Sequence, residues 1–184
     1  YFSLLFFWLP AISYPQWNAS SAINTPVAIA TYDQQDLRIV PDGKKGAIIT
    51  WVDYRNNLLN ADIYVQRIDS AGIVKWTTNG INICSNTASQ AAPALSEDGK
   101  GGAIVVWQDW RNADRDIYAQ RVDASGVALW TTDGVPIYTA ADNNSYAIPY
   151  LVSDGAGGAI ITWQDSRSGN FDIYAQNVQE DGSL

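Results

Sequence analysis

The 184-residue chain has no histidine, no methionine and one cysteine, and its 11 basic residues are outnumbered by 19 acidic ones. The absence of histidine excludes Ser-His-Asp and Cys-His catalysis, histidine metal ligands and imidazole pH switches. A single thiol, Cys84, excludes an intrachain disulfide and a cysteine zinc site, and we interpret it as a small apolar strand residue. The net charge of −8 argues against a nucleic-acid partner, because binding to phosphates requires clusters of Lys and Arg.

What the chain does contain is ample apolar surface. Hydrophobic residues make up 47% of the sequence, which argues against disorder. No segment has a sustained 3.6-residue period, whereas short runs rich in β-branched residues alternate with turn signals such as Asp-Gly. The sequence therefore predicts an all-β protein, and its length is that of one domain.

The first 13 residues differ from the rest of the chain. Residues 1–9 are almost wholly apolar, and Ala11-Ile12-Ser13 has the small-x-small form of a signal peptidase site. We interpret residues 1–13 as the remnant of a secretory signal, with a hydrophobic strand packed in the fold as the alternative. The run is shorter than the about 20 apolar residues that span a bilayer. We therefore expect a secreted, periplasmic or cell-surface protein without a stable membrane span.

From Trp17 to the end, one motif of the form DGxGGAIxxWxDxR…DIYAQR occurs three times, in units 17–75, 76–129 and 130–184. Equivalent Asp and Trp residues are 56 positions apart, which is typical of a repeat architecture. The shared positions are Asp42, Asp98 and Asp154; Trp51, Trp107 and Trp163; Asp53, Asp109 and Asp165; Asp62, Asp116 and Asp172; and Tyr64, Tyr118 and Tyr174.

Each unit is expected to hold four short antiparallel strands separated by turns. In the second unit we predict strands over residues 93–96, 103–107, 116–122 and 127–130, and the continuous apolar run in 103–107 indicates burial on both faces. Four such strands with repeated aromatics indicate a β-propeller blade, which needs a neighbouring blade to cover its faces. The fold class is therefore all-β, with three repeats of about 56 residues forming part of a propeller.

The motif resembles the WD-like repeat of the TolB family of periplasmic β-propellers, and more closely the longer repeats of secreted bacterial surface proteins. The matching residues of the second unit are Pro93, Ser96, Asp98, Gly99, Asp109, Arg111, Asp116, Ile117 and Tyr118. The resemblance covers residues 17–184 and implies the propeller fold. It says little about function, because propellers host many unrelated activities.

Three units are fewer than the four to eight blades of most propellers. Alignment places the fourth strand of the third unit beyond Leu184, whereas residues 13–18 supply an extra strand with Trp17. Two explanations are open. Either the sequence is part of a longer chain, or two chains close a six-bladed ring as a homodimer, each lending its N-terminal strand to the other.

The repeated Asp-x-Arg pairs are the first candidate site. Their arginines could converge near the propeller axis and bind an anionic ligand, as arginine clusters do in propeller sialidases. Alternatively, each Asp accepts hydrogen bonds from its own turn while each Arg connects adjacent strands. We favour the second interpretation because identical residues in every unit serve the same purpose in every unit. The pairs are Asp53 and Arg55, Asp109 and Arg111, and Asp165 and Arg167.

Two further sets of oxygen-bearing residues are weaker candidates. Asp62, Asp116 and Asp172 could act as general acids or bases, but none of them stands out from the repeat, so we name no catalytic residue. The turns 98–101 and 142–145 offer oxygen ligands suitable for Ca²⁺, without EF-hand spacing. We interpret both as hairpin turns and expect no required cofactor.

Trp110 and Tyr54 share one position in a polar turn, where the third unit has Ser166. An aromatic residue in such a turn is suited to sugar stacking or protein contact. We therefore predict a non-catalytic extracellular or cell-surface scaffold for a protein or glycan partner. The alternatives are a glycan-processing hydrolase of sialidase-like shape and a self-assembling structural surface protein.

Overall fold

The computed structural model describes residues 17–18, 20–139 and 147–184. The proposed signal remnant and the turn 142–145 lie outside this part of the chain. The strands are β1 (Gln34–Pro41), β2 (Ala47–Asp53), β3 (Asp62–Ile68), β4 (Ile81–Cys84), β5 (Gln90–Glu97), β6 (Ala103–Asp109), β7 (Asp116–Val122), β8 (Val135–Tyr138), β9 (Tyr150–Ser153), β10 (Ala159–Asp165) and β11 (Asp172–Val178).

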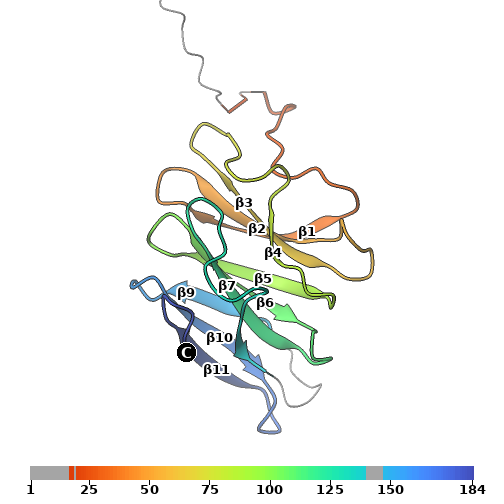
Figure 1. Ribbon diagram of the computed structural model, residues 1–184, viewed down its shortest axis with the longest axis vertical. Coiled ribbons are helices and arrows are strands. Elements are labelled where there is room, and N and C mark those ends of the chain that lie inside the picture. Colours follow the sequence, from red (N-terminus) through yellow and green to blue (C-terminus); the bar gives the residue numbers. More distant parts are fainter. Residues whose placement is uncertain (1–16, 19, 140–146) are drawn as a thin grey trace, which may run out of the picture.

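These strands form three antiparallel sheets in chain order (Figure 1). The first sheet has the order β1-β2-β3-β4, the second β5-β6-β7-β8, and the third β9-β10-β11. The sheets contact one another through their first strands, β1 with β5 and β5 with β9. The all-β prediction is confirmed, and the sheets have the strand order and stacking of β-propeller blades. Within the described ranges, no helix has the length and apolar character needed to cross a bilayer.

The predicted fourth strand of the second unit is wrong. Residues 127–130 make only an isolated bridge, between Ala128 and Val122, and the fourth strand is β8. The reason is that Trp130 is directed to the third sheet, where its indole Nε1 donates to the carbonyl of Glu180 at 3.0 Å. Gly134, with a φ of 88°, then reverses the chain into β8. Residues 17–18 of the expected extra N-terminal strand do not form a strand, and residues 13–16 are outside the described part.

The hydrophobic core consists of two clusters, each between neighbouring sheets. In β2 and β6 successive side chains alternate between the two faces, and both faces are buried. One cluster joins Ile48 and Ile63 of the first sheet to Val105 and Trp107 of the second. The other repeats this arrangement between the second and third sheets. Trp107, one of the tryptophans shared by the repeats, therefore belongs to the core between the first and second sheets.

Polar contacts also cross between the sheets at equivalent positions. Trp76, which lies between β3 and β4 of the first sheet, donates from Nε1 to the carbonyl of Ala124, in the turn after β7 of the second sheet, at 3.2 Å. A Cβ on Gly126 would lie 2.9 Å from the Trp76 ring, so this turn requires glycine for both its positive φ and its contact. Arg67 donates to the same carbonyl at 3.0 Å. Each sheet is therefore fixed to the next by an indole and a guanidinium.

Candidate functional site

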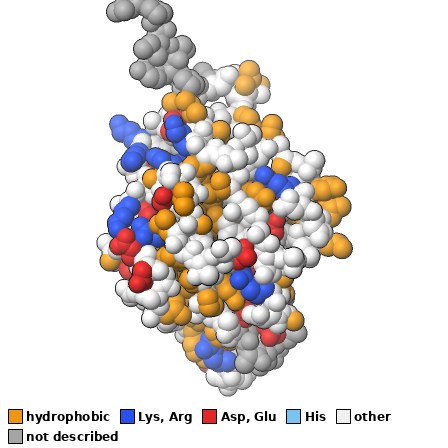
Figure 2. Space-filling model, viewed as in Figure 1, with side chains coloured by type: hydrophobic (Ala, Val, Ile, Leu, Met, Phe, Trp, Pro, Cys, Tyr) orange, Lys and Arg blue, Asp and Glu red, His pale blue; other side chains and the backbone are white. Residues whose placement is uncertain are grey.

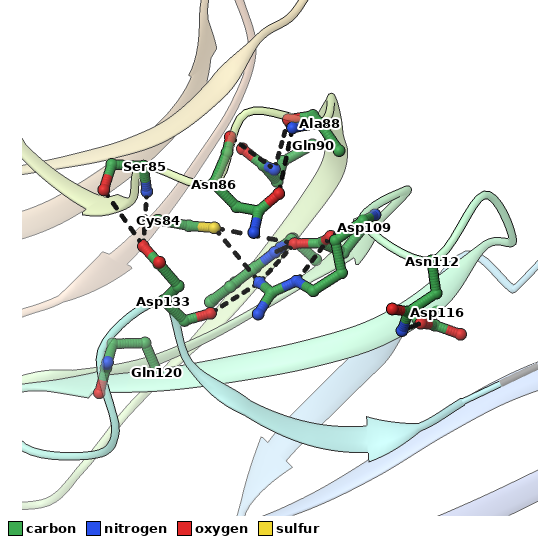
Figure 3. Close-up of polar contacts among 12 residues, drawn as sticks. Cys84, Ser85, Asn86, Ala88, Gln90, Asp109, Asn112, Asp116, Gln120 and Asp133 are labelled. Atoms are coloured by element: carbon green, nitrogen blue, oxygen red, sulfur yellow. Dashed lines mark hydrogen bonds and ion pairs between the residues drawn. The ribbon is translucent and has the colours of Figure 1, made fainter.

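The Asp-x-Arg pair of the second sheet is the centre of a dense polar cluster at the end of β6 (Figure 3). The Asp109 carboxylate accepts from the Arg111 backbone N–H, from Arg111 Nε at 2.9 Å and from Arg111 Nη2 at 2.7 Å. It also accepts from Trp107 Nε1 at 2.9 Å. The Arg111 guanidinium lies over the Tyr118 ring, 3.6 Å from its centroid. We call Asp109, Arg111, Trp107 and Tyr118 the Asp–Arg cluster.

The first and third sheets contain the same cluster. Arg55 donates to Asp53 and lies 3.9 Å from the centroid of the Tyr64 ring. In the third sheet Arg167 forms the bidentate pair with Asp165 and lies over the Tyr174 ring. The corresponding indoles of Trp51 and Trp163 donate to the aspartates.

Each guanidinium also contacts a neighbouring segment. Arg55 Nη2 donates to the carbonyl of Asn79 at 2.7 Å. Arg111 Nη2 donates to the carbonyl of Asp133 at 2.8 Å and to the Cys84 sulfur at 3.4 Å, and Arg167 lies over the Tyr138 ring of the second sheet. We expected each Asp to accept hydrogen bonds from its own turn and each Arg to connect adjacent strands. These hydrogen bonds are present, because each guanidinium joins its own hairpin to a neighbouring segment. The structure does not bring the three arginines to one shared acceptor, and anion binding by them stays a prediction.

The ionisation of these groups follows from their contacts. Burial of the Asp53 carboxyl raises its pKa, but hydrogen bonds from Arg55 and Trp51 outweigh this effect and leave the pKa lowered. For Asp165 the hydrogen bonds from Arg167 dominate and lower the pKa to about 2. For Arg111, burial opposes the charge, but the Asp109 carboxylate raises the pKa. The pairs of Asp53 with Arg55 and of Asp165 with Arg167 are thus ionised at neutral pH, which suits structure better than proton transfer.

We predict a loss of stability at acid pH from these carboxylates. The pKa values of Asp53 and Asp165 lie below the ordinary value of 3.8, so the unfolded chain binds their protons more tightly. Their contribution is complete above the unfolded-state pKa and disappears as the pH falls through the folded-state pKa, about 2 for Asp165. Urea unfolding midpoints should fall between about pH 4 and about pH 2.5, and less so in Asp165→Asn. A midpoint constant over this range would contradict the assignment.

The Asp-Gly turn 98–101, which was considered for Ca²⁺, has its Asp98 carboxylate oxygens engaged within the chain. In the second sheet, Asp98 Oδ1 accepts from the backbone N–H groups of Lys100 and Gly102, both at 2.8 Å. Its Oδ2 accepts from Arg121 at 2.9 Å. Asp42 makes the equivalent contacts, with Arg67 in the place of Arg121. In the described part of the chain, no three or more His, Cys, Asp or Glu side chains gather as a metal site.

Cys84 lies beside the Asp–Arg cluster of the second sheet (Figure 3). Its Sγ is 3.7 Å from Asp109 Oδ2, and the side chain is buried. Burial raises the pKa of the thiol to about 12, with the Asp109 charge adding to the effect. The interpretation of Cys84 as a strand residue is confirmed, because it ends β4.

We predict that Cys84 is unreactive in the folded protein. At about pH 8 its thiolate fraction is roughly 1,000-fold smaller than for an ordinary thiol, and burial restricts access further. When native protein is mixed with a disulfide reagent such as dithionitrobenzoate, Cys84 should release no thionitrobenzoate over minutes. Protein unfolded in guanidinium should react fully. Rapid reaction of the native protein would contradict the raised pKa.

The aspartates that open the third strands lie directly opposite the Asp–Arg clusters. Asp62 pairs in register with Asp53, and its Oδ2 accepts from Asn56 Nδ2 at 2.8 Å. Burial raises the pKa of Asp62, the hydrogen bond from Asn56 lowers it, and the Asp53 charge raises it further, so the net direction is upward. The same cross-strand pairing of two aspartates is made by Asp109 with Asp116 and by Asp165 with Asp172. Two aspartates paired across neighbouring strands are therefore a property of the repeat rather than of one sheet.

The loops between the second and third strands leave the same end of each sheet (Figure 1). We call residues 54–61, 110–115 and 166–171 the hairpin-loop surface. The aromatic residues proposed for binding lie here, both half-buried: Tyr54 packs against the core, and Trp110 lies 5.8 Å from the Arg115 guanidinium. Hydrophobic side chains gather at the edge of the molecule near the β2–β3 loop (Figure 2).

Three apolar residues of the hairpin-loop surface were not predicted from the sequence. Leu58, Leu59 and Phe171 are exposed in the same loops. Departure from the repeat could have identified them, because Leu58 and Leu59 fall in the stretch that makes the first loop longer than the other two, and Phe171 has a polar Arg115 at the equivalent position. These loops therefore expose three apolar side chains that depart from the repeat.

No family model matches the chain, and no curated protein matches its sequence. Among solved structures, an α-L-arabinanase of Penicillium chrysogenum, complexed with arabinobiose, is similar with 12% identity and a TM-score of 0.42. The match covers 79% of this chain and 45% of the arabinanase chain, so this chain spans less than half of that protein.

Proposed function

We propose that the protein is a non-catalytic binding scaffold of the cell surface or extracellular space, with the hairpin-loop surface as its contact for a partner. One observation carries this proposal. The repeated Asp and Arg side chains are engaged with each other and with the backbone, whereas Leu58, Leu59 and Phe171, which depart from the repeat, are exposed on the loops. A rigid frame with variable loops is a common basis of recognition.

The chemistry of the loops favours a protein partner over a glycan. Leu58 and Leu59 are exposed and aliphatic, and aliphatic side chains contribute to protein interfaces but offer no flat ring for a sugar to stack on. Trp110 beside Arg115 combines the two residue types that dominate binding energy at protein interfaces. Trp110 also suits a glycan, so a glycan partner is kept as the second possibility for the same surface.

Photo-crosslinking from the loops tests this function. A benzophenone amino acid placed at Leu59 or at Ala113 should capture a partner on cells of the source organism. The same amino acid at Lys44, in the exposed β1–β2 turn, is the matched control. The proposal predicts one shared product from both loop positions that Trp110→Ala weakens and that is absent from the control. Equal labelling from all three positions, or none, would reject the surface.

A glycan-processing hydrolase is the second candidate function, favoured by one observation. Asp62 has a raised pKa and lies opposite the ionised Asp53, as an acid and a carboxylate do in glycosidases. The recurrence of this pair in every sheet is the reason that we rank the hydrolase second. Hydrolysis of a panel of aryl glycosides and sialosides, abolished by Asp62→Asn, would support it over the scaffold. Wild-type and variant should both be inactive if the protein is a scaffold.

A further inference from the structure

The third sheet has an exposed apolar face, whereas the equivalent faces of the other two sheets are buried. Ile160 and Ile173 lie on the side of this sheet facing away from the second sheet, because their neighbours Ile161 and Tyr174 face the core between them. Their side chains are 46% and 75% exposed. The equivalent residues are 0% exposed: Ile48 and Ile63 in the first sheet, Ile104 and Ile117 in the second. We call this surface, with Tyr150 and Val152, the forward face.

The outer edge of the third sheet also differs from the others. β3 pairs with β4 and β7 pairs with β8, whereas β11 pairs only with β10 among the described strands. The forward face and the β11 edge are adjacent, since Ile173 belongs to both. An open strand edge beside an apolar face is a template for adding a further strand.

The first sheet presents the complementary surface. Leu37 and Ile39 of β1 are 63% and 60% exposed. Their equivalents in the second sheet, Pro93 and Leu95, are buried against the sheet that precedes them. We call this side of the first sheet the back face. Within the chain, every contact between sheets joins a forward face to a back face, so each of these two exposed faces has the shape of a partner for the other.

The N-terminal segment 20–33 and Trp17 contact the first sheet as a preceding blade would. Trp17 Nε1 donates to the carbonyl of Ser70, as Trp76 does to Ala124 in the second sheet. The Ile29 N–H donates to Asn79 Oδ1, and the Asp33 carbonyl accepts from the Tyr54 N–H. In the second sheet these contacts are made by Ser85 with Asp133 and by Ser89 with Trp110. The segment is therefore equivalent to residues 76–89, which include β4.

This equivalence assigns a fourth-strand sequence to the N-terminal segment. If Ile29 corresponds to Ser85, then residues 25–28 correspond to β4 and, in the next unit, to β8. The two sequences are Thr-Pro-Val-Ala and Val-Pro-Ile-Tyr, with proline at the same position. Within a sheet, proline occurs mainly in edge strands, at the first residue of a strand or at bulges, and β8 is an edge strand. Residues 25–28 have no strand partner among the described residues.

We propose that the third sheet binds the first sheet of a second copy of this chain, whose residues 25–28 pair with β11 as a fourth strand. The pairing of β7 with β8 gives the register. Because Ala119 is opposite Val135 and Tyr118 is opposite Pro136, Ala175 is opposite Thr25 of the second copy and Tyr174 is opposite its Pro26. Ile160 and Ile173 then cover Leu37 and Ile39 of that copy. Two such contacts close a ring of six sheets from two chains.

The contact between copies is weaker than the contacts within the chain. Arg67 and Arg121 each donate across to the next sheet, but the third sheet has Asn177 at this position. Asn177 Nδ2 is directed at the Ala159 carbonyl of its own sheet instead. Without the guanidinium, association depends mainly on apolar area and strand pairing. The assembly should therefore depend on protein concentration and little on salt.

Cysteine pairs of the full chain test the proposed register. Thr25→Cys and Ala175→Cys are made as separate proteins, each retaining the buried Cys84. Under mild oxidation their mixture should give a disulfide-linked pair of chains, because opposite strand residues lie within the Cα distance that a disulfide spans. Leu59→Cys, an exposed loop position, is the matched control for Thr25→Cys and should give no linked pair with Ala175→Cys. Linkage equal to the control, or none, would overturn the proposal.

Solution mass of paired variants provides the second measurement. Wild-type chain should reach twice its 20.1 kDa mass as concentration rises, and either Ile173→Asp or Ile39→Asp should remain at one chain mass. Val127→Asp, a matched apolar-to-acid change at a 56% exposed residue away from both faces, should leave assembly unchanged. A mixture of Ile173→Asp with Ile39→Asp should recover pairs, because one forward–back contact stays intact. A wild-type chain that stays at one chain mass at every concentration would overturn the proposal.

Discussion

Asp109→Asn is expected to lower the free energy of unfolding by about 3–5 kcal/mol, because it leaves a largely buried guanidinium without its counter-charge. The Asp109 side chain is fully buried and that of Arg111 is only 15% exposed. The carboxylate accepts from both side-chain nitrogens of Arg111 that face it and from Trp107 Nε1. Asparagine keeps the shape but removes the charge and one acceptor. Urea unfolding followed by tryptophan fluorescence measures the change.

Asp165→Asn is the matched control for this prediction. The chemistry of the pair is the same in the third sheet, but the Arg167 side chain is 39% exposed and can be solvated when the carboxylate is lost. We expect a cost of about 1 kcal/mol there, in the range of exposed ion pairs. Equal losses at the two positions would show that burial of the guanidinium is not the cause.

Trp107→Ala has the second large expected effect, a loss of about 3–5 kcal/mol. Trp107 is the largest fully buried side chain among the described residues and lies in the core between the first and second sheets. Its removal leaves a cavity there and also takes a hydrogen-bond donor from Asp109. Because the sheets depend on each other for burial, we expect one cooperative transition at lower denaturant concentration rather than separate unfolding of one sheet.

Trp17→Ala is the control for the tryptophan prediction. Trp17 is 54% exposed and makes one hydrogen bond, to the Ser70 carbonyl. Its removal should cost no more than about 1 kcal/mol, as is usual for exposed positions. A loss at Trp107 as small as at Trp17 would contradict the assignment of Trp107 to the core.

The repeat made much of the fold predictable. The third strand was predicted over residues 116–122 and is β7 with these bounds, and the predicted second strand lies within β6. Local sequence was sufficient because β-branched runs bounded by Asp-Gly turns specify hairpins. The fourth strand was misplaced since residues 127–130 have a strand-like composition, while Trp130 is fixed by Glu180, 50 residues away.

Other features could not be predicted because they depend on distant contacts. Arg121 contacts both Asp98 in its own sheet and Glu180 in the next, and no local pattern links Arg121 with Glu180. The exposure of Ile173 is equally invisible in the sequence, because Ile63 and Ile117 occupy the same repeat position and are buried. Whether a face is covered depends on what packs against it, and not on its own residues.

We infer that the repeated Asp–Arg clusters stabilise the hairpins of the sheets and leave recognition to the loops and outer faces. A double-mutant cycle of Asp109→Ala and Arg111→Ala measures this most directly, since it isolates the energy of the pair itself. The account predicts a coupling free energy of about 1.5–3 kcal/mol, with the double variant much less destabilised than the sum of the single variants. Additive losses with no coupling would contradict it, and would return these arginines to consideration as ligand-binding residues.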